Sequence, residues 1–344
     1  MIDTRTPASN SPVHAPGSIG WLKALARAMT GESVISIYAP GGKDRRSVRL
    51  ELSSGRTVIA TRRENLDRAE HEAAILSVLH QSGAPVPEVI GFRDGLLLQS
   101  DAGRNRLSFA MTEADAATRD RLARKAIEAL ETCRAAVEAQ PDLLASLPGL
   151  GTRPGWAEEL VSRAIFLSGD LRIATPRIDA DVVAQALSQP PVRFTRWDAR
   201  LGNAAVQADG SVIWFDWDLF GRRAGVEDVS WLIADNYWPL DRDATEVLLA
   251  EAIPDNALRR LAVRMAVVIA IGRLSKIRER VALNGWADAV VTLREDRVGA
   301  VPSVVTDLCR RMSDLTADDP VQAGLSRWFL DAGAAITAMS PEKA

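Results

Sequence analysis

Hydrophobic and polar positions alternate along the first hundred residues in the way that β-strands require. Residues 47–52 alternate apolar with charged side chains, and this period of two predicts a strand with one buried face. Residues 34–38 and 57–63 predict two further strands, with Ser53-Ser54-Gly55 as the turn between the second strand and the third. The chain therefore begins its folded part with a small antiparallel sheet.

Helical patterns occur beside these strands. Ser18 is a plausible N-cap for a short helix with one apolar face, and residues 66–81 predict a longer helix. The sequence Pro85-Val86-Pro87 ends the helical pattern, because proline cannot continue a helix. Residues 89–92 and 96–99 then predict two more strands joined by a turn.

The pattern changes after residue 112, where helical periodicity dominates. The predicted helical segments are 113–140, 154–168, 179–189, 227–232, 258–283 and 321–338. The whole chain thus predicts an α+β fold in three parts. These are a flexible tail at residues 1–17, a small N-terminal lobe at 18–100 and a large helical C-terminal lobe at 101–344.

Composition narrows the class of protein. A chain of 344 residues with 47% hydrophobic content can bury a large core, and its formal net charge of -3 argues against binding to nucleic acid. Neither Cys133 and Cys309 nor the three histidines show the spacing of a disulfide framework or a zinc site. The longest apolar run, residues 265–271, is too short for a membrane span, and the N-terminus lacks an apolar signal core. We expect a cytoplasmic protein.

Candidate chemistry lies between Arg196 and Asp218, where Asp198 is followed five residues later by Asn203 and then by Asp216. Phosphoryl transfer requires mainly positioning and charge neutralisation. One carboxylate orients the attacking hydroxyl, while a second carboxylate and an amide oxygen hold hard cations. These three residues are of the required types.

The chain between Asn203 and Asp216 predicts a tight hairpin. Residues 204–207 and 212–215 are strand-like and flank Ala208-Asp209-Gly210-Ser211, and Asp-Gly between such runs is a strong hairpin signal. The hairpin would return Asp216 to the neighbourhood of Asn203. Taken singly, these features also occur in ordinary surface loops, and only their combination indicates phosphoryl transfer.

The segment resembles the catalytic and metal-binding loops of the aminoglycoside phosphotransferase and choline kinase group. Arg196-Trp197-Asp198 is similar to the start of H-R-D-x-x-x-x-N, and Phe215-Asp216-Trp217 is similar to the Ile-Asp-Trp of these small-molecule kinases. Arg196 stands where the family has a histidine that is mainly architectural. The resemblance implies a protein-kinase-like fold of two lobes, with ATP and Mg2+ bound between them.

The same resemblance implies roles for residues of the helical lobe. Asp198 would act as the base or hydroxyl-orienting group, and Asn203 and Asp216 would bind Mg2+. Arg200 would stabilise the transferring phosphate, although a salt bridge to a nearby carboxylate explains it equally well. Asp228 would brace the catalytic loop from a helix start, where a plain N-cap residue is also expected.

In the small lobe, Ile59-Ala60-Thr61-Arg62 is similar to the V-A-I-K of kinases, and Glu72 resembles the helix carboxylate that pairs with the cation. Arg63 is an equal alternative to Arg62, and a solvated strand end would also account for Arg62. Gln99, Ser100 and Asp101 occupy the linker position, where such kinases hydrogen-bond adenine through backbone groups.

Two further features leave alternatives open. Ala39-Pro40-Gly41-Gly42-Lys43 lies where a phosphate-covering loop is expected, but a simple Gly-Gly turn explains it as well. Five tryptophans crowd the catalytic region, and aromatic rings recognise cationic or sugar-like ligands. Most are expected in the core, and Trp238 is the best pocket candidate. The five are Trp197, Trp214, Trp217, Trp231 and Trp238.

The sequence thus predicts an ATP- and Mg2+-dependent phosphotransferase that acts on a hydroxyl of a small molecule, such as an aminoglycoside, an amino alcohol or a sugar. The alternative is a weakened or inactive kinase-like protein that binds nucleotide. An unrelated helical binding protein with a loop that mimics the motif is a third possibility. Neither a nucleic acid nor a membrane is expected as a partner.

Overall fold

The computed structural model describes residues 15–39 and 46–340, and the chain forms two compact units. We call residues 1–74 with 88–101 the sheet unit, and residues 75–87 with 102–344 the helical unit. The boundary falls inside helix α2 (Leu66–Gln81). The α+β class with an antiparallel sheet and many helices is confirmed.

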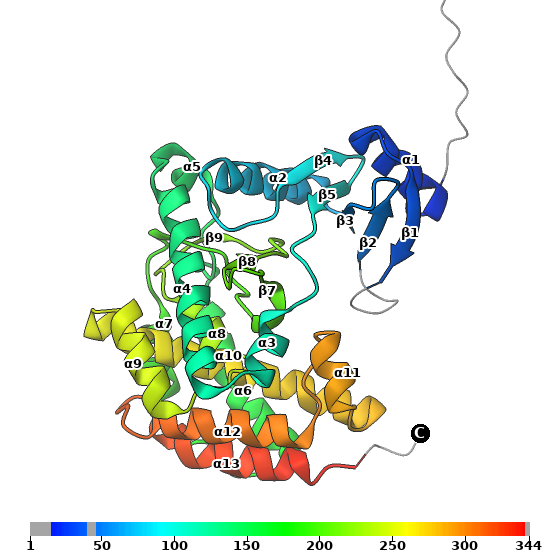
Figure 1. Ribbon diagram of the computed structural model, residues 1–344. Helices are drawn as coiled ribbons and strands as arrows, with labels where there is room; N and C mark the ends of the chain where they lie inside the picture. Colours follow the sequence, from blue (N-terminus) through cyan, green and yellow to red (C-terminus); the bar gives the residue numbers. More distant parts are fainter. Residues whose placement is uncertain (1–14, 40–45, 341–344) are drawn as a thin grey trace, which may run out of the picture. The chain divides into compact units, whose positions relative to one another are not determined.

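The sheet unit contains a five-stranded antiparallel sheet in the order β1-β2-β3-β5-β4 (Figure 1). Its elements are α1 (Ile19–Thr30), β1 (Val34–Tyr38), β2 (Ser47–Leu52), β3 (Thr57–Arg62), the start of α2, β4 (Val89–Arg93) and β5 (Leu96–Ser100). All five predicted strands are confirmed within one or two residues at their ends. The Ser18 hydroxyl accepts a hydrogen bond from the Trp21 N–H at 3.1 Å, which confirms the predicted N-cap.

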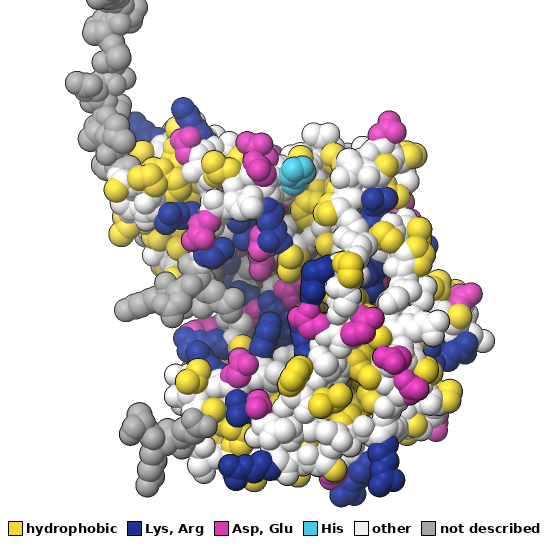
Figure 2. All heavy atoms as spheres, turned by 180° about the vertical axis from the view of Figure 1, so that it is seen from behind, with side chains coloured by type: hydrophobic (Ala, Val, Ile, Leu, Met, Phe, Trp, Pro, Cys, Tyr) yellow, Lys and Arg dark blue, Asp and Glu magenta, His cyan; other side chains and the backbone are white. Residues whose placement is uncertain are grey.

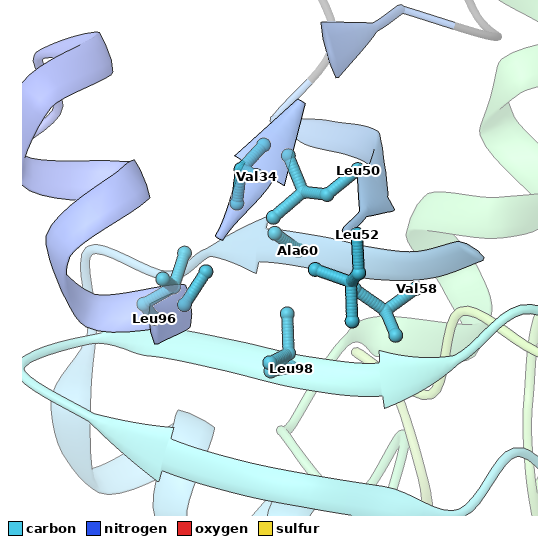
Figure 3. Close-up of a cluster of buried hydrophobic side chains, with 8 residues drawn as sticks. Val34, Leu50, Leu52, Val58, Ala60, Leu96 and Leu98 are labelled. Atoms are coloured by element: carbon cyan, nitrogen blue, oxygen red, sulfur yellow. The ribbon is translucent and has the colours of Figure 1, made fainter. Parts of the chain in front are cut away.

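The core of the sheet unit lies on one face of the sheet. Leu50 and Leu52 of β2 project onto the same side as Val58 and Ala60 of β3, because alternate side chains of a strand share a face (Figure 3). Ala26 of α1 packs into this cluster. The apolar positions of the alternation in β2 therefore face this core, whereas Arg49 on the opposite face is also buried.

In its described residues after residue 101, the helical unit contains eleven α-helices, the short 3-10 helix η1 and two small sheets. The helices are α3 (Leu107–Glu113), α4 (Ala116–Glu138), α5 (Pro141–Ser146), α6 (Trp156–Leu171), α7 (Ala180–Leu187), η1 (Leu201–Asn203), α8 (Glu227–Ile233), α9 (Arg242–Ala252), α10 (Asn256–Asn284), α11 (Ala289–Arg294), α12 (Pro302–Thr316) and α13 (Gly324–Thr337), of which η1 is the 3-10 helix and the others are α-helices. Helices α12 and α13 lie side by side (Figure 1).

The two small sheets of the helical unit carry the candidate loops. Strands β6 (Arg193–Thr195) and β9 (Gly221–Arg223) pair with each other, as do β7 (Ala204–Val206) and β8 (Val212–Trp214). The β7–β8 pair is the predicted hairpin. The β6–β9 pair and helix α12 were not predicted, and α13 begins at Gly324, three residues after the predicted start.

The surface charges and the two cysteines of the described residues show no feature that points to a further function. Figure 2 shows acidic and basic side chains interspersed over the face that it displays. Cys133 and Cys309 are buried free thiols, and burial raises the pKa of each to about 12. Among the described residues, none of the helices has the length and apolar character that crossing a bilayer requires.

The core of the sheet unit can be tested at Leu50, which is fully buried in β2. We expect Leu50→Ala to lower the free energy of unfolding by about 2–5 kcal/mol, because it removes buried methyl groups and leaves a cavity. Urea denaturation measures this change. Ile35→Ala on β1 is the matched control, since Ile35 is 57% exposed, and its effect should stay within about 0.5 kcal/mol. Equal effects of the two substitutions would contradict this core.

Candidate active site

The loop predicted to be catalytic, residues 196–203, follows β6 and is held in an unusual backbone conformation. We call it the catalytic loop. Trp197 and Asp198 have φ angles of 57° and 49°, in the left-handed region that costs non-glycine residues about 1–3 kcal/mol each. The buried carboxylate of Asp228 on α8 offsets this cost. It accepts hydrogen bonds from the Thr195 hydroxyl at 2.8 Å, the Arg196 N–H at 3.1 Å and the Trp197 N–H at 2.8 Å. Asp228 therefore braces the loop with its side chain, and is not the N-cap of α8, which is Val226.

The carboxylate of Asp198 is oriented by two neighbours. Its Oδ1 accepts from Arg200 Nε at 3.0 Å, and its Oδ2 accepts from Asn203 Nδ2 at 3.0 Å. The Asp198 side chain is 26% exposed, so its carboxylate is fixed in direction and still accessible to solvent. A group held in this way is suited to receive a proton from a bound hydroxyl.

Arg200 shares its charge among several acceptors. Its Nη1 contacts Asp296 at 3.1 Å, and its Nη2 donates to Asn203 Oδ1 at 3.3 Å. Burial by itself lowers the pKa of Arg200, but the charges of Asp296 and Asp198 raise it above its ordinary value. The salt bridge that the sequence left open is present, and a role toward phosphate stays a prediction.

The β7–β8 hairpin brings the predicted metal-binding loop, residues 215–217, back to Asn203. Ala204 pairs with Trp214, and the Phe215 N–H donates to the Asn203 carbonyl at 2.9 Å. Asp216 comes next, with a φ of 62° and an exposed side chain. Hydrogen bonds therefore connect Asn203 both to Asp198 and to the segment that carries Asp216.

The donors at these loops fit a magnesium ion that is shared with phosphate. Asn203 and Asp216 offer amide and carboxylate oxygens, which are hard donors. In the described parts of the chain there is no group of three or more His, Cys, Asp or Glu side chains able to hold a metal. Magnesium needs no such group, because it usually binds one or two carboxylates and completes its shell with waters and substrate phosphates. At present Arg200 donates to the Asn203 oxygen.

Arg196, the departure from the family pattern, connects the two loops. Its guanidinium donates to the carbonyls of Asp198 at 2.8 Å, of Asp216 at 3.1 Å and of Phe215. The side chain is only 1% exposed and stacks on the rings of Trp214 and Trp217, at 5.0 and 5.3 Å from their centroids. Burial lowers the pKa of Arg196, while the charges of nearby aspartates raise it. Arginine therefore ties the catalytic loop to the metal-binding loop through their backbones.

In the sheet unit the cation beside Glu72 is Arg63. Its Nε and Nη2 both donate to the Glu72 carboxylate at 2.7 Å, and this ion pair is almost fully buried. Arg62, one residue earlier, is exposed and lies against Gly17. Of the two alternatives, the structure gives the ion pair to Arg63, because residue 63 lies on the opposite face of the sheet from Arg62.

The predicted linker residues Gln99, Ser100 and Asp101 lie within the sheet unit, and two of them form hydrogen bonds to other residues of that unit. The carboxylate of Asp101 accepts from Arg49 Nη2 at 2.9 Å and from the Thr57 hydroxyl at 2.8 Å. Ser100 exchanges two hydrogen bonds with Glu88, each at 2.9 Å. Gln99 is buried, and its side-chain nitrogen lacks a partner among the described residues. The predicted loop at residues 40–43 lies outside the described residues.

Comparison with known proteins decides the family. A profile of the phosphotransferase enzyme family matches residues 38–263, about two thirds of the chain. The chain belongs to this family. Its predicted identity as a kinase-like phosphotransferase is confirmed. Among curated protein sequences, none matches significantly.

Solved structures of phosphotransferases share the fold of this phosphotransferase. A candidate aminoglycoside phosphotransferase from Ralstonia eutropha JMP134 has a TM-score of 0.52 and 14% identity, over 92% of this chain and 97% of its own. An amicoumacin kinase in complex with AMP-PNP, Ca2+ and Ami has a TM-score of 0.52 and 12% identity, over 80% and 92%. The gentamicin complex of APH(2")-IIa has a TM-score of 0.50 and 11% identity, over 80% and 93%. At these identities the likeness concerns the fold alone.

The tryptophans of the phosphotransferase divide into two groups. Trp214 and Trp217 are fully buried, and Trp238 is 2% exposed with its indole N–H donating to the Thr245 hydroxyl at 3.0 Å. Trp238, expected as the best pocket residue, is therefore part of the core. Trp197 is half-buried, and its ring lies 6.1 Å from that of Trp231.

Two residues of the site were not predicted from the sequence. Asp296 contacts Arg200, and Asp235 is buried with its carboxylate accepting from the Leu201 N–H at 3.2 Å. Asp296 is 96 positions from Arg200, so no local spacing reveals it.

The role of Arg196 can be tested by Arg196→Lys. We expect this change to lower the free energy of unfolding by about 2–3 kcal/mol, because a lysine cannot donate to both loops and leaves buried carbonyls unpaired. Arg193→Lys, in an exposed pair with Glu138, is the matched control and should cost about 0.5 kcal/mol or less. Chemical denaturation of both variants checks the difference. A stability of Arg196→Lys equal to that of the control would refute the tie between the loops.

Proposed function

We propose that this phosphotransferase moves the γ-phosphoryl group of ATP to a hydroxyl of a small molecule, with Asp198 as the base. The observation that carries the proposal is the Asp198 carboxylate, held between Arg200 and Asn203 at 3.0 Å from each. The hairpin adds Asp216 to the same loops. These groups supply the positioning and the charge that phosphoryl transfer requires.

Asp198 acts on the acceptor hydroxyl. The hydroxyl oxygen forms a bond to the γ-phosphorus, the bond from that phosphorus to the β–γ bridging oxygen breaks, and the hydroxyl proton passes to the Asp198 carboxylate. ADP leaves with the electron pair of the broken bond. Arg200, next to this carboxylate, offsets negative charge that spreads over the transferring oxygens.

Asn203 and Asp216 are the proposed holders of Mg2+. When bound, Mg2+ neutralises charge on the phosphates of ATP. The Asn203 oxygen becomes available to a metal once its hydrogen bond from Arg200 Nη2, now 3.3 Å long, opens, while Arg200 Nη1 stays on Asp296. Asp216 presents its carboxylate at the surface, where a hydrated ion shared with phosphate can reach it.

The nucleotide is assigned to the N-terminal lobe at residues 18–100 together with the linker. Arg63, paired with Glu72, supplies a buried cation at the end of β3, and Arg62 is its exposed neighbour. A guanidinium binds phosphate as a planar fork. Gln99, Ser100 and Asp101 follow on β5 and the linker, where backbone groups would pair with adenine.

The acceptor class is the least determined part of the proposal. Aminoglycosides, amino alcohols and sugars all carry hydroxyls that Asp198 can orient. Acidic side chains near the catalytic loop, such as Asp235 and Asp296, favour a cationic acceptor. We therefore propose an amino-group-bearing polyol, and a panel of such compounds against neutral sugars tests the preference.

The base is tested with Asp198→Asn in the full chain. We expect turnover to fall roughly 10²- to 10⁴-fold, the usual contribution of general base catalysis, while ATP still binds. ADP release with kanamycin, choline and myo-inositol measures turnover, and thermal shift with ATP and magnesium measures binding. Asp209→Asn, in the turn of the hairpin, is the control. Unchanged turnover would remove Asp198 from the mechanism, and binding without any wild-type turnover would favour the inactive alternative.

The metal assignment is tested with Asp216→Asn. We expect the magnesium concentration for half-maximal turnover to rise roughly tenfold or more, because a ligand oxygen loses its charge. The thermal stabilisation by ADP should also lose its dependence on magnesium. Asp209→Asn again serves as the matched Asp to Asn change and should alter neither quantity. A magnesium requirement that does not move would show that Asp216 is no ligand.

A further inference from the structure

Asp296 occupies a backbone position that usually belongs to glycine. It follows the end of α11, whose C-cap is Glu295, and has a φ of 49°. Glycine is the usual residue at such a left-handed position after a helix, because other residues have a Cβ atom that is crowded there. Asp296 is also 8% exposed, so its charge is nearly buried. A strained and buried charge points to a function of its side chain.

The side chain of Asp296 reaches the catalytic loop. Its two oxygens accept from Arg200 Nη1 at 3.1 and 3.4 Å, and Oδ2 lies 3.8 Å from Arg106 Nη1. Arg106 also donates to the carbonyl of Gly202. One carboxylate thus lies between two arginines that both contact the loop.

Gly202 makes room for this carboxylate. A Cβ atom at residue 202 would overlap Oδ1 and Cγ of Asp296, so any side chain there displaces Asp296. Gly202 itself is the middle residue of η1, immediately before Asn203. The loop and the segment after α11 are therefore fitted to each other at van der Waals distance.

Asp296 determines where the charge of Arg200 lies. Arg200 uses its Nε edge for Asp198, Nη2 for Asn203 and Nη1 for Asp296. Without the Asp296 contact, the only partners left for Arg200 among these three are the base and the proposed metal ligand. The guanidinium would then lose the contact that fixes its Nη1 edge, and its orientation beside the base would no longer be set.

We propose that Asp296 is a positioning residue that holds Arg200 in the orientation needed for phosphoryl transfer. The inference rests on the proposed function of Asp198 and Arg200. Residue 296 lies outside residues 38–263, which match the family profile, so the C-terminal part of this chain completes a catalytic loop that the family segment begins. Asp296 acts through Arg200 and takes no proton itself.

The decisive variant is Asp296→Gly, because it removes the carboxylate and relieves the left-handed backbone at once. A residue that served only the left-handed backbone at this position would be replaced by glycine without loss of kcat. Positioning predicts instead that kcat falls roughly 10- to 100-fold, since a small misplacement of a catalytic group has this effect, while KM for the acceptor stays within about twofold. The probe is whichever of kanamycin, choline and myo-inositol the wild type phosphorylates fastest, or ATP hydrolysis by water if none is phosphorylated.

Asp94→Gly is the matched control. Asp94 also has a left-handed φ, of 51°, and its side chain is 67% exposed in the turn before β5. The same substitution there should leave kcat and KM unchanged. If Asp296→Gly does not fold, Asp296→Asn keeps the shape and the backbone preference, and the same fall in kcat is expected from the loss of charge.

A double-mutant cycle with Gly202→Ala tests the contact itself. The alanine displaces Asp296, so Gly202→Ala alone should lower kcat about as much as Asp296→Gly, roughly 10- to 100-fold. In the Asp296→Gly background the alanine has nothing to displace and should cost less than about twofold further. Losses that multiply would overturn the inference.

The outcomes separate this inference from the proposed function. If Asp198→Asn abolishes turnover while Asp296→Gly and Asp296→Asn keep it within about twofold, the positioning role is wrong and the proposed function stands. If Asp198→Asn leaves turnover intact, the proposed function fails and the role of Asp296 fails with it. A fall in kcat for the Asp296 variants alone, with unchanged acceptor KM, supports the inference.

Discussion

The conformation of the catalytic loop depends on two buried charged side chains, Asp228 and Arg196, which form hydrogen bonds to its backbone. The Asp228 carboxylate accepts hydrogen bonds from the N–H groups of Arg196 and Trp197, and the Arg196 guanidinium donates to the carbonyl of Asp198. Hydrogen bonds to ionised groups are about twice as strong as neutral ones, so these bonds can hold two consecutive left-handed residues. The direction of the Asp198 side chain, and with it the proposed chemistry, follows from that backbone.

Charge balance then explains why so many arginines surround the loop. Arg196 and Arg200 each lie near more than one aspartate, and burial of an unpaired charge would be costly. Arg273 adds a further, half-buried cation, with Nε donating to Asn236 at 2.6 Å. The side chains therefore satisfy one another before any ligand binds.

Local patterns in the sequence were enough for the sheet and the hairpin, because the causes are local. Alternation in β2 and the Asp-Gly turn before β8 depend on neighbouring residues only. Helix α12 also has a local signal, with a proline at its start and buried positions such as Val305, Leu308 and Met312 at helical spacing, so its cause too is local. The contact of Asp296 with Arg200 joins distant parts of the chain, and no spacing rule covers it. The choice of Arg63 over Arg62 depends on how β3 ends, which the pattern leaves open.

The arginine at position 196 bears on whether the departure from the family pattern weakens the enzyme. Its polar contacts go to backbone carbonyls, and its aromatic contacts go to buried rings, so its work is structural. A histidine has two ring nitrogens and donates from both only when it is charged, whereas a guanidinium donates from five N–H groups and stays charged. The substitution therefore adds a connection between the catalytic and metal-binding loops. The groups that phosphoryl transfer needs, at Asp198, Asn203 and Asp216, are all retained, and this argues for an active phosphotransferase over the inactive alternative.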